Sequence, residues 1–114
     1  MANNLARGDI WYADFNPIRG HEQSGVRPAL IVSADAFHRG PAELVMVLPL
    51  TTKQRGLPSR VAMLPPEGGV REASYVMVDQ LRTISHDRLR DRIGTASPLT
   101  LSIVEDRLRL LLDL

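Results

Sequence analysis

Cysteine is absent from this chain of 114 residues, which excludes disulfide bonds and metal sites built from thiolates. That absence fits a reducing cytoplasm, which is the location we expect. Long hydrophobic runs are also missing: the most apolar tract, Leu108 to Leu114, is interrupted by Arg109 and Asp113 and is too short to span a bilayer. The polar stretch Ala2 to Asp9 predicts no secretory signal.

The chain carries little net charge, +1, whereas a dedicated duplex-DNA-binding domain usually shows a stronger basic footprint. Yet 13 of the 14 basic side chains are arginines, and Lys53 is the exception. The planar guanidinium fork suits phosphate oxygens, although codon preference would enrich arginine equally. The composition therefore permits RNA binding without requiring it.

Most signatures of cofactor and metal chemistry are missing. The sequence has no Gly-x-Gly-x-x-Gly, no P-loop and no His-Glu-x-x-His. The histidines His21, His38 and His86 are far apart and lack metal-ligand spacing. We expect neither a metal nor an organic cofactor, and we expect His38 and His86 to be structural or surface residues.

Short apolar segments bounded by glycine, proline and polar residues predict five strands. They are Asp9–Phe15, Arg27–Ser33, Glu43–Leu50, Arg60–Leu64 and Ser74–Val78. After these strands, the spacing of the apolar residues no longer follows the two-residue alternation of a strand. Ser85 is expected to cap a short helix from His86 to Arg92, and Ile93 to Ala96 to form one further strand.

A terminal helix is predicted to begin at Ser97-Pro98, a hydroxyl cap followed by proline at the first helical position. Apolar side chains then recur at helical spacing. They are Leu101, Val104, Leu108 and Leu111. Residues 1–114 are therefore expected to form a single, mainly β domain, a small barrel-like sheet of about five to six strands closed by a helix. Leu110, Leu112 and Leu114 either enter a dimer interface or pack on their own domain.

Polar side chains concentrate in three segments that follow or link the predicted strands. The segments are Arg19–Arg27, Thr51–Arg55 and Asp79–Thr83. Loops at strand ends bring residues that are distant in sequence into one site. Such a cluster would offer donors to phosphate oxygens and both donors and acceptors to base edges, although loops are polar in most proteins.

These segments and their flanks carry a resemblance to a known family. The matching segments are Arg7–Tyr12, Asp14–Pro17, Gly20–Pro28, Pro49–Thr52 and Asp79–Ile84. In order, spacing and residue type they resemble the MazF/PemK toxins of type II toxin–antitoxin systems, from about Arg7 to the final helix. The resemblance implies an SH3-like, CcdB/PemK-like barrel and a homodimer. It implies metal-independent, sequence-specific cleavage of single-stranded RNA to 2′,3′-cyclic phosphate and 5′-hydroxyl ends, and neutralisation by an antitoxin whose acidic segment occupies the RNA groove.

The resemblance assigns catalysis to Arg27 and Thr51. Charge builds on the phosphoryl oxygens in the transition state, and fixed donors aimed at them lower the barrier. Arg27 would supply a charged fork and Thr51 a hydroxyl. The resemblance also implies a set of substrate-binding residues. They are Phe15, Asn16, Pro17, His21, Glu22, Gln23, Thr52, Lys53, Ser74, Asp79, Gln80 and Arg82.

Several of these residues have a second interpretation. His21 either transfers a proton or contacts a phosphate or base. Phe15 either stacks on an unpaired base or packs in the core. Asp79 would accept from an exocyclic amine or pair with Arg82, and Ser74 lines the groove or merely begins its strand. Trp11 and Tyr12 alternate in face, so one is expected in the core and the other at an edge or interface.

Two other functions share parts of this pattern. A CcdB-like toxin that binds DNA gyrase would explain the sheet and helix but not Arg27 and Thr51 at their motif positions. A non-catalytic RNA-binding module would keep the groove without the reaction. Cleavage of RNA by the pure protein separates the nuclease from both.

Overall fold

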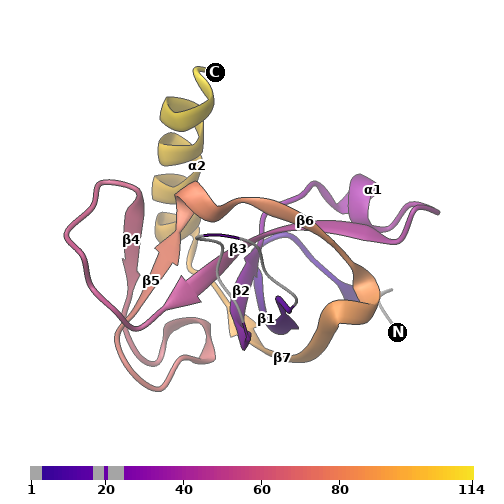
Figure 1. The fold of residues 1–114 in the computed structure, drawn as a ribbon, viewed down its shortest axis with the longest axis horizontal. Coiled ribbons are helices and arrows are strands. Elements are labelled where there is room, and N and C mark those ends of the chain that lie inside the picture. Colours follow the sequence, from indigo (N-terminus) through magenta and orange to yellow (C-terminus); the bar gives the residue numbers. More distant parts are fainter. Residues whose placement is uncertain (1–3, 17–19, 21–24) are drawn as a thin grey trace.

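Antiparallel strands form the body of the protein in residues 4–16, 20 and 25–114, the part of the chain that the structure, a computed structural model, describes (Figure 1). The seven strands in this part are β1 (Asp9–Asp14), β2 (Val26–Ile31), β3 (Leu44–Thr51), β4 (Arg60–Met63), β5 (Ser74–Met77), β6 (Arg82–Ser85) and β7 (Leu89–Thr95). The helices are α1 (Asp35–His38), α2 (Pro98–Leu112) and the 3-10 turns η2 (Glu67–Gly69), η3 (Val78–Gln80) and η4 (His86–Arg88).

Strand β3 is the centre of the sheet because it pairs with three others along its length. Leu44–Val47 pair with β6, Val47–Pro49 with β2, and Leu50–Thr51 with β5. β1 then joins β2 to β7, and η4 connects β7 back to β6. The chain therefore curls into a ring, with the β4–β5 hairpin extending from the end of β3 (Figure 1). The mainly β fold with a C-terminal helix is confirmed.

Two hydrophobic clusters lie on the two faces of β3. Val45 and Val47 belong to the cluster inside the ring, whereas Leu48 and Leu50 belong to the cluster under β4, β5 and α2. A strand that is covered on both faces needs apolar side chains at nearly every position, not at every second one. This explains the almost unbroken apolar run that predicted the third strand.

Helix α2 begins as predicted. The Ser97 hydroxyl accepts the Thr100 N–H at 3.1 Å, and Pro98 occupies the first helical position. Val104 is buried in the second cluster, while the last turns project beyond the sheet (Figure 1). Leu110 and Leu114 do not pack on their own domain, because they are 75% and 84% exposed, whereas Leu112 lines a hollow with Val78 and Leu81.

The sequence interpretation was wrong between residues 82 and 92, whereas the further strand expected at Ile93–Ala96 is the end of β7. The expected helix His86–Arg92 is only the turn η4, and β7 already begins at Leu89. Two register shifts in the β1–β7 pairing interrupt the alternation of apolar and polar residues that marks a strand. The sequence of β7 therefore lacks the pattern that would have predicted it. The four-residue strand β6 was missed because its pairing with the distant β3 defines it.

Candidate functional site

Arg27 lies near the start of β2 and is held over the end of β3. Its backbone pairs with Ala13 of β1, and its Nη1 donates to the Leu50 carbonyl at 3.3 Å. The side chain is half-buried, and this burial lowers the pKa of the Arg27 guanidinium from its ordinary value, because the charged form loses hydration. The guanidinium is thus fixed beside the next residue of β3, Thr51.

Thr51 is the last residue of β3. Its backbone pairs with Tyr75 of β5, and its Oγ1 accepts the Lys53 N–H at 3.2 Å. A hydroxyl that accepts from an N–H still has its own proton to donate. The bond from Arg27 to Leu50 and the position of Thr51 therefore bring a charged fork and a hydroxyl donor to the same strand end.

A pocket at this strand end collects five of the predicted site residues. Its lining comprises Arg27, Pro28, Leu50, Thr51, Thr52, Lys53 and Ser74. Ser74 is buried in the wall of the pocket, where its hydroxyl donates to the Glu72 carbonyl at 2.9 Å. This serine therefore both begins β5 and lines the pocket.

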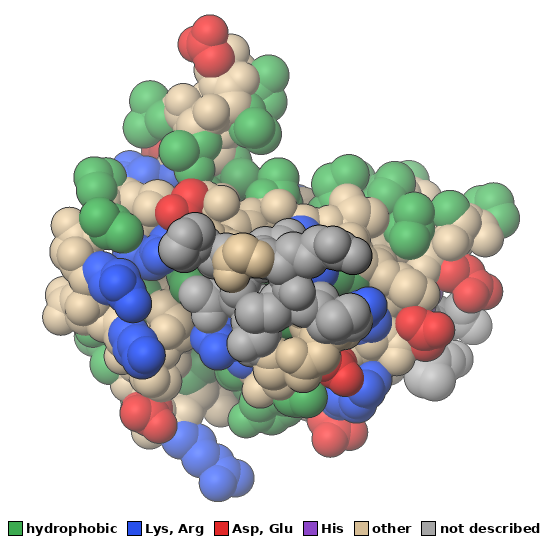
Figure 2. Space-filling model, in the orientation of Figure 1, with side chains coloured by type: hydrophobic (Ala, Val, Ile, Leu, Met, Phe, Trp, Pro, Cys, Tyr) green, Lys and Arg blue, Asp and Glu red, His purple; other side chains and the backbone are tan. Residues whose placement is uncertain are grey.

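A second pocket shares Arg27, Thr51 and Lys53 with the first and adds Arg55, Arg60 and Met77. Lys and Arg side chains gather over the β4–β5 side of this face (Figure 2). Arg55 belongs to the polar segment Thr51–Arg55 but was not among the predicted binding residues, and Arg60 was not predicted at all. Arg60 is the first residue of β4, and its pairing opposite Met77 of β5 brings it to this pocket.

The alternative in which Asp79 pairs with Arg82 is not what the structure shows. Asp79 Oδ1 instead accepts from Arg60 Nη1 across the β4–β5 hairpin. The Arg82 guanidinium lies 5.2 Å from the ring centre of Phe15. Phe15 itself is fully buried, so the core interpretation is confirmed and the ring has no exposed face on which a base could stack.

The other predicted binding residues lie around the β1–β2 connection and η3. Asn16 is exposed, and its Oδ1 accepts the Gly25 N–H at 3.2 Å. Arg88 donates to the carbonyls of Asp14 and Asn16, which fastens the end of β1. Gln80 is partly exposed at the end of η3. Pro17, His21, Glu22 and Gln23 lie outside the described residues.

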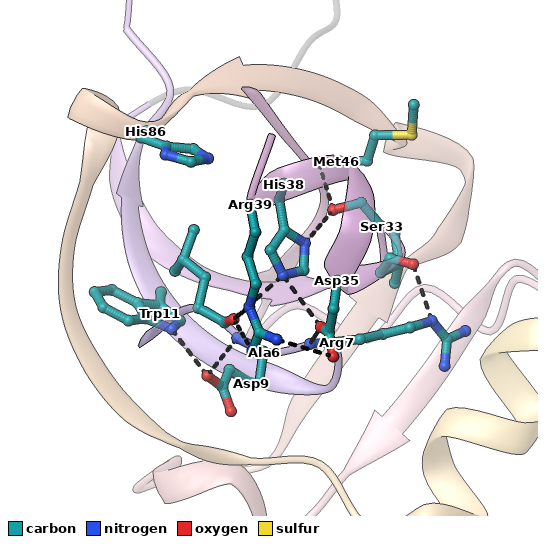
Figure 3. Close-up of polar contacts among 12 residues, drawn as sticks. Ala6, Arg7, Asp9, Trp11, Ser33, Asp35, His38, Arg39, Met46 and His86 are labelled. Carbon is teal, nitrogen blue, oxygen red and sulfur yellow. Dashed lines mark hydrogen bonds and ion pairs between the residues drawn. The ribbon is translucent and has the colours of Figure 1, made fainter. Parts of the chain in front are cut away.

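The two described histidines have structural roles. His38 is fully buried, with Nδ1 2.8 Å from the Ser33 hydroxyl and Nε2 3.2 Å from the Leu5 carbonyl (Figure 3). His86 Nε2 lies 3.1 Å from the Leu44 carbonyl. Among the described residues, no group of three or more His, Asp or Glu side chains could hold a metal ion. None of the helices in that part of the chain has the length and hydrophobicity of a membrane span.

Trp11 and Tyr12 lie on opposite faces of β1, one buried and one exposed, as their alternation predicted. Trp11 is buried in the ring cluster, with its Nε1 3.4 Å from Asp9 Oδ2, whereas Tyr12 is exposed.

Comparison with known proteins matches this arrangement to one family. A family model described as PemK-like, MazF-like toxin of type II toxin–antitoxin system matches residues 6–112. The endoribonuclease EndoA of Bacillus subtilis is 32% identical over 111 residues, covering 96% of each chain. The endoribonuclease MazF9 of Mycobacterium tuberculosis is 31% identical over 115 residues, covering 96% of this chain and 98% of that protein.

Solved structures give the same result. The crystal structure of MazF from Deinococcus radiodurans aligns with a TM-score of 0.85 and 32% identity, over 96% of this chain and 97% of that one. A mycobacterial endoribonuclease in complex with its cognate antitoxin aligns with a TM-score of 0.80 and 31% identity, over 96% of both chains.

Proposed function

Because the chain belongs to the PemK-like, MazF-like toxins of type II toxin–antitoxin systems, we propose that Arg27 and Thr51 form its catalytic pair for cutting single-stranded RNA. Proteins of this family are endoribonucleases, and the CcdB-like gyrase-binding alternative is not favoured. The observation that carries the assignment is the bond from Arg27 to the Leu50 carbonyl, which fixes the guanidinium next to Thr51 in one pocket.

The proposed reaction needs no cofactor. The 2′-oxygen forms a bond to the adjacent phosphorus while the bond from phosphorus to the 5′-oxygen breaks, which yields a 2′,3′-cyclic phosphate and a 5′-hydroxyl. The 2′-hydroxyl loses its proton to a base, and the leaving oxygen gains one. The charge that develops on the phosphoryl oxygens would be met by the Arg27 fork and the Thr51 hydroxyl.

The two adjoining pockets form a groove, and we propose that this groove binds RNA. When the toxin is inactive, the groove would hold an acidic segment of the antitoxin. Thr52, Lys53 and Ser74 line it together with Arg27 and Thr51. A groove whose donors suit phosphates also suits the carboxylates of an acidic segment. A mycobacterial relative has been solved with its cognate antitoxin, which supports a partner of this kind here.

We also propose a cytoplasmic homodimer built from one domain. Helix α2 carries exposed leucines, and the groove between η3 and α2 is lined mainly by apolar side chains. An apolar surface of this kind is more typical of an interface than of a free surface. The chain would place its RNA groove on the β2–β3–β5 side of each protomer.

The first experiment is cleavage of a long single-stranded RNA by the purified protein in excess EDTA, beside an Arg27→Ala variant. We expect discrete fragments with 2′,3′-cyclic phosphate ends, absent with the variant, and mapping the ends gives the recognition sequence. Intact RNA in the presence of a folded dimer would refute the nuclease assignment. Inhibition of purified gyrase would then support the CcdB-like alternative.

A further inference from the structure

Arg60 is a nearly buried cation that the catalytic assignment does not use. Its side chain is only 10% exposed, at the start of β4 opposite Met77 of β5. It lines the second pocket together with Arg27, Thr51 and Lys53. A charged side chain is rarely buried to this extent without partners that compensate its lost hydration.

The partners of Arg60 compensate only part of that loss. Its Nη1 donates to Asp79 Oδ1, and the Asp79 side chain is itself 36% exposed. Its Nε is buried and has no hydrogen-bond partner among the described residues. A guanidinium offers five N–H donors, so an anion that entered the pocket would meet donors that the protein leaves unused.

The rest of the pocket strengthens the case for an anion. Lys53 and Arg55 are exposed cations on the loop that follows β3, and Arg27 forms the wall shared with the first pocket. Among the described residues that line it, none is acidic. Four cations with one neighbouring carboxylate create a positive potential that attracts a phosphate.

The position of this pocket identifies the phosphate. The two pockets share Arg27 and Thr51, so they adjoin at the proposed reaction centre. Consecutive phosphates of a strand are only one nucleotide apart. An RNA whose scissile phosphate lay against Arg27 and Thr51 would therefore have a neighbouring phosphate within reach of the second pocket.

We propose that Arg60, with Arg55 and Lys53, forms a second phosphate subsite that binds the backbone phosphate next to the scissile one. The inference rests on the proposed ribonuclease function and extends it. Arg60 acts in binding and register, because contacts to phosphates position the strand without reading its sequence. The subsite contributes to RNA affinity and thus to KM, whereas the bond-breaking step depends on Arg27 and Thr51.

The test compares Arg60→Met, which keeps the length of the side chain and removes its charge, with Arg109→Met. Arg109 also pairs with an aspartate, Asp106, but on the exposed face of α2. Binding is measured by fluorescence anisotropy with an RNA that carries a 2′-deoxy residue at the cleavage site. We expect Arg60→Met to weaken binding about tenfold and to reduce the salt slope by about 0.7, the value for one phosphate contact on a single strand. Arg109→Met should change neither.

Neutral methylphosphonate linkages locate the contact. A neutral linkage one nucleotide from the cleavage site should weaken binding to the wild type about tenfold and have little further effect on Arg60→Met. Saturating RNA should restore the kcat of Arg60→Met to nearly the wild-type value. Because Arg60 is buried, the exposed Arg55→Met provides a second variant that should fold normally and show a smaller effect in the same direction.

Other results would overturn the subsite. If Arg60→Met and Arg55→Met are folded and bind RNA with wild-type affinity and salt slope, no phosphate binds there. If they instead lose only the binding of an oligoglutamate peptide, the pocket recognises a protein partner. Failure of the ribonuclease assignment would look different, because the wild-type protein itself would then cut no RNA.

Discussion

Two buried polar regions of this protein differ in how completely their hydrogen bonds are satisfied. Around His38, Nε2 lies 3.2 Å from the Leu5 carbonyl and Nδ1 lies 2.8 Å from the Ser33 hydroxyl, which also accepts the Met46 N–H at 3.2 Å. In the groove, Arg60 keeps a buried N–H without a partner among the described residues. The first region has no capacity left for a ligand, whereas the second has donors to spare.

This difference separates stability from function. A satisfied buried network holds its elements together, and removing one member leaves the others with unmet hydrogen bonds. A buried donor without an acceptor lowers stability by itself, and a ligand that supplies the acceptor offsets that cost. The following substitutions should therefore affect either activity or folding, but not both.

Arg27→Ala should give the largest effect on activity. We expect kcat for RNA cleavage to fall by about 10² to 10³, roughly 3 to 4 kcal/mol at the transition state, as for loss of one preorganised donor. Single-turnover cleavage measures this fall, and thermal unfolding should show a midpoint close to that of the wild type. A folded variant with wild-type kcat would remove Arg27 from the reaction.

Gly94→Ala should give the largest effect on folding. A Cβ at residue 94 would lie 2.4 Å from the Gly68 carbonyl carbon, so β7 and η2 would have to separate. We expect a loss of about 3 kcal/mol in urea unfolding, at the upper end of overpacking effects. Gly56→Ala is the matched control: its positive φ of 64° strains alanine, but nothing lies within 4 Å, so about 1 kcal/mol is expected.

Ser33→Ala should destabilise the hydrogen-bond network around His38 and leave the proposed RNA-binding residues unchanged. It leaves the Met46 N–H and His38 Nδ1 without the hydroxyl that now joins them. We expect a loss of about 2 kcal/mol in unfolding free energy, with the kcat of the folded protein unchanged. Ser102→Ala on the exposed face of α2 is the control and should change stability little. Equal losses from the two substitutions would contradict a special role for the network.

The parts of the fold with strong local signals could be predicted from the sequence. The apolar run of β3 and the Ser97-Pro98 start of α2 are such signals, and both elements were found where they were expected. Strand β6 is defined by its pairing with β3, and the start of β7 by its pairing with β1. The register shifts between β1 and β7 also disrupt the alternation of apolar and polar residues in β7. Local sequence carries no record of such pairing, so these segments were assigned incorrectly.

The candidate site divides in the same way. Arg27, Thr51, Thr52, Lys53 and Ser74 were predicted from motif positions and line one pocket. Arg60 carried no motif, and its role depends on a hairpin register that brings β4 opposite β5. The pairing of Asp79 with Arg60 was not foreseen for the same reason, since the two residues are far apart in the sequence and meet only in the folded hairpin.

Substitution of Asp35, which lies at the exposed edge of the hydrogen-bond network around His38, should give the smallest change in stability. The Arg7 N–H donates to Asp35 Oδ1 at 2.8 Å, and this bond, together with Arg39 and His38, lowers the carboxyl pKa from its ordinary value. A lowered folded pKa contributes stability above the unfolded pKa of about 3.9, and that stability is lost as the pH falls through the folded pKa. The wild type should therefore unfold at a slightly higher temperature than Asp35→Asn near pH 6, and the difference should vanish in acid below the folded pKa. Melting curves recorded across this range test the sign, because a gap that widened toward acid would mean that the carboxyl is stabilised in its protonated form.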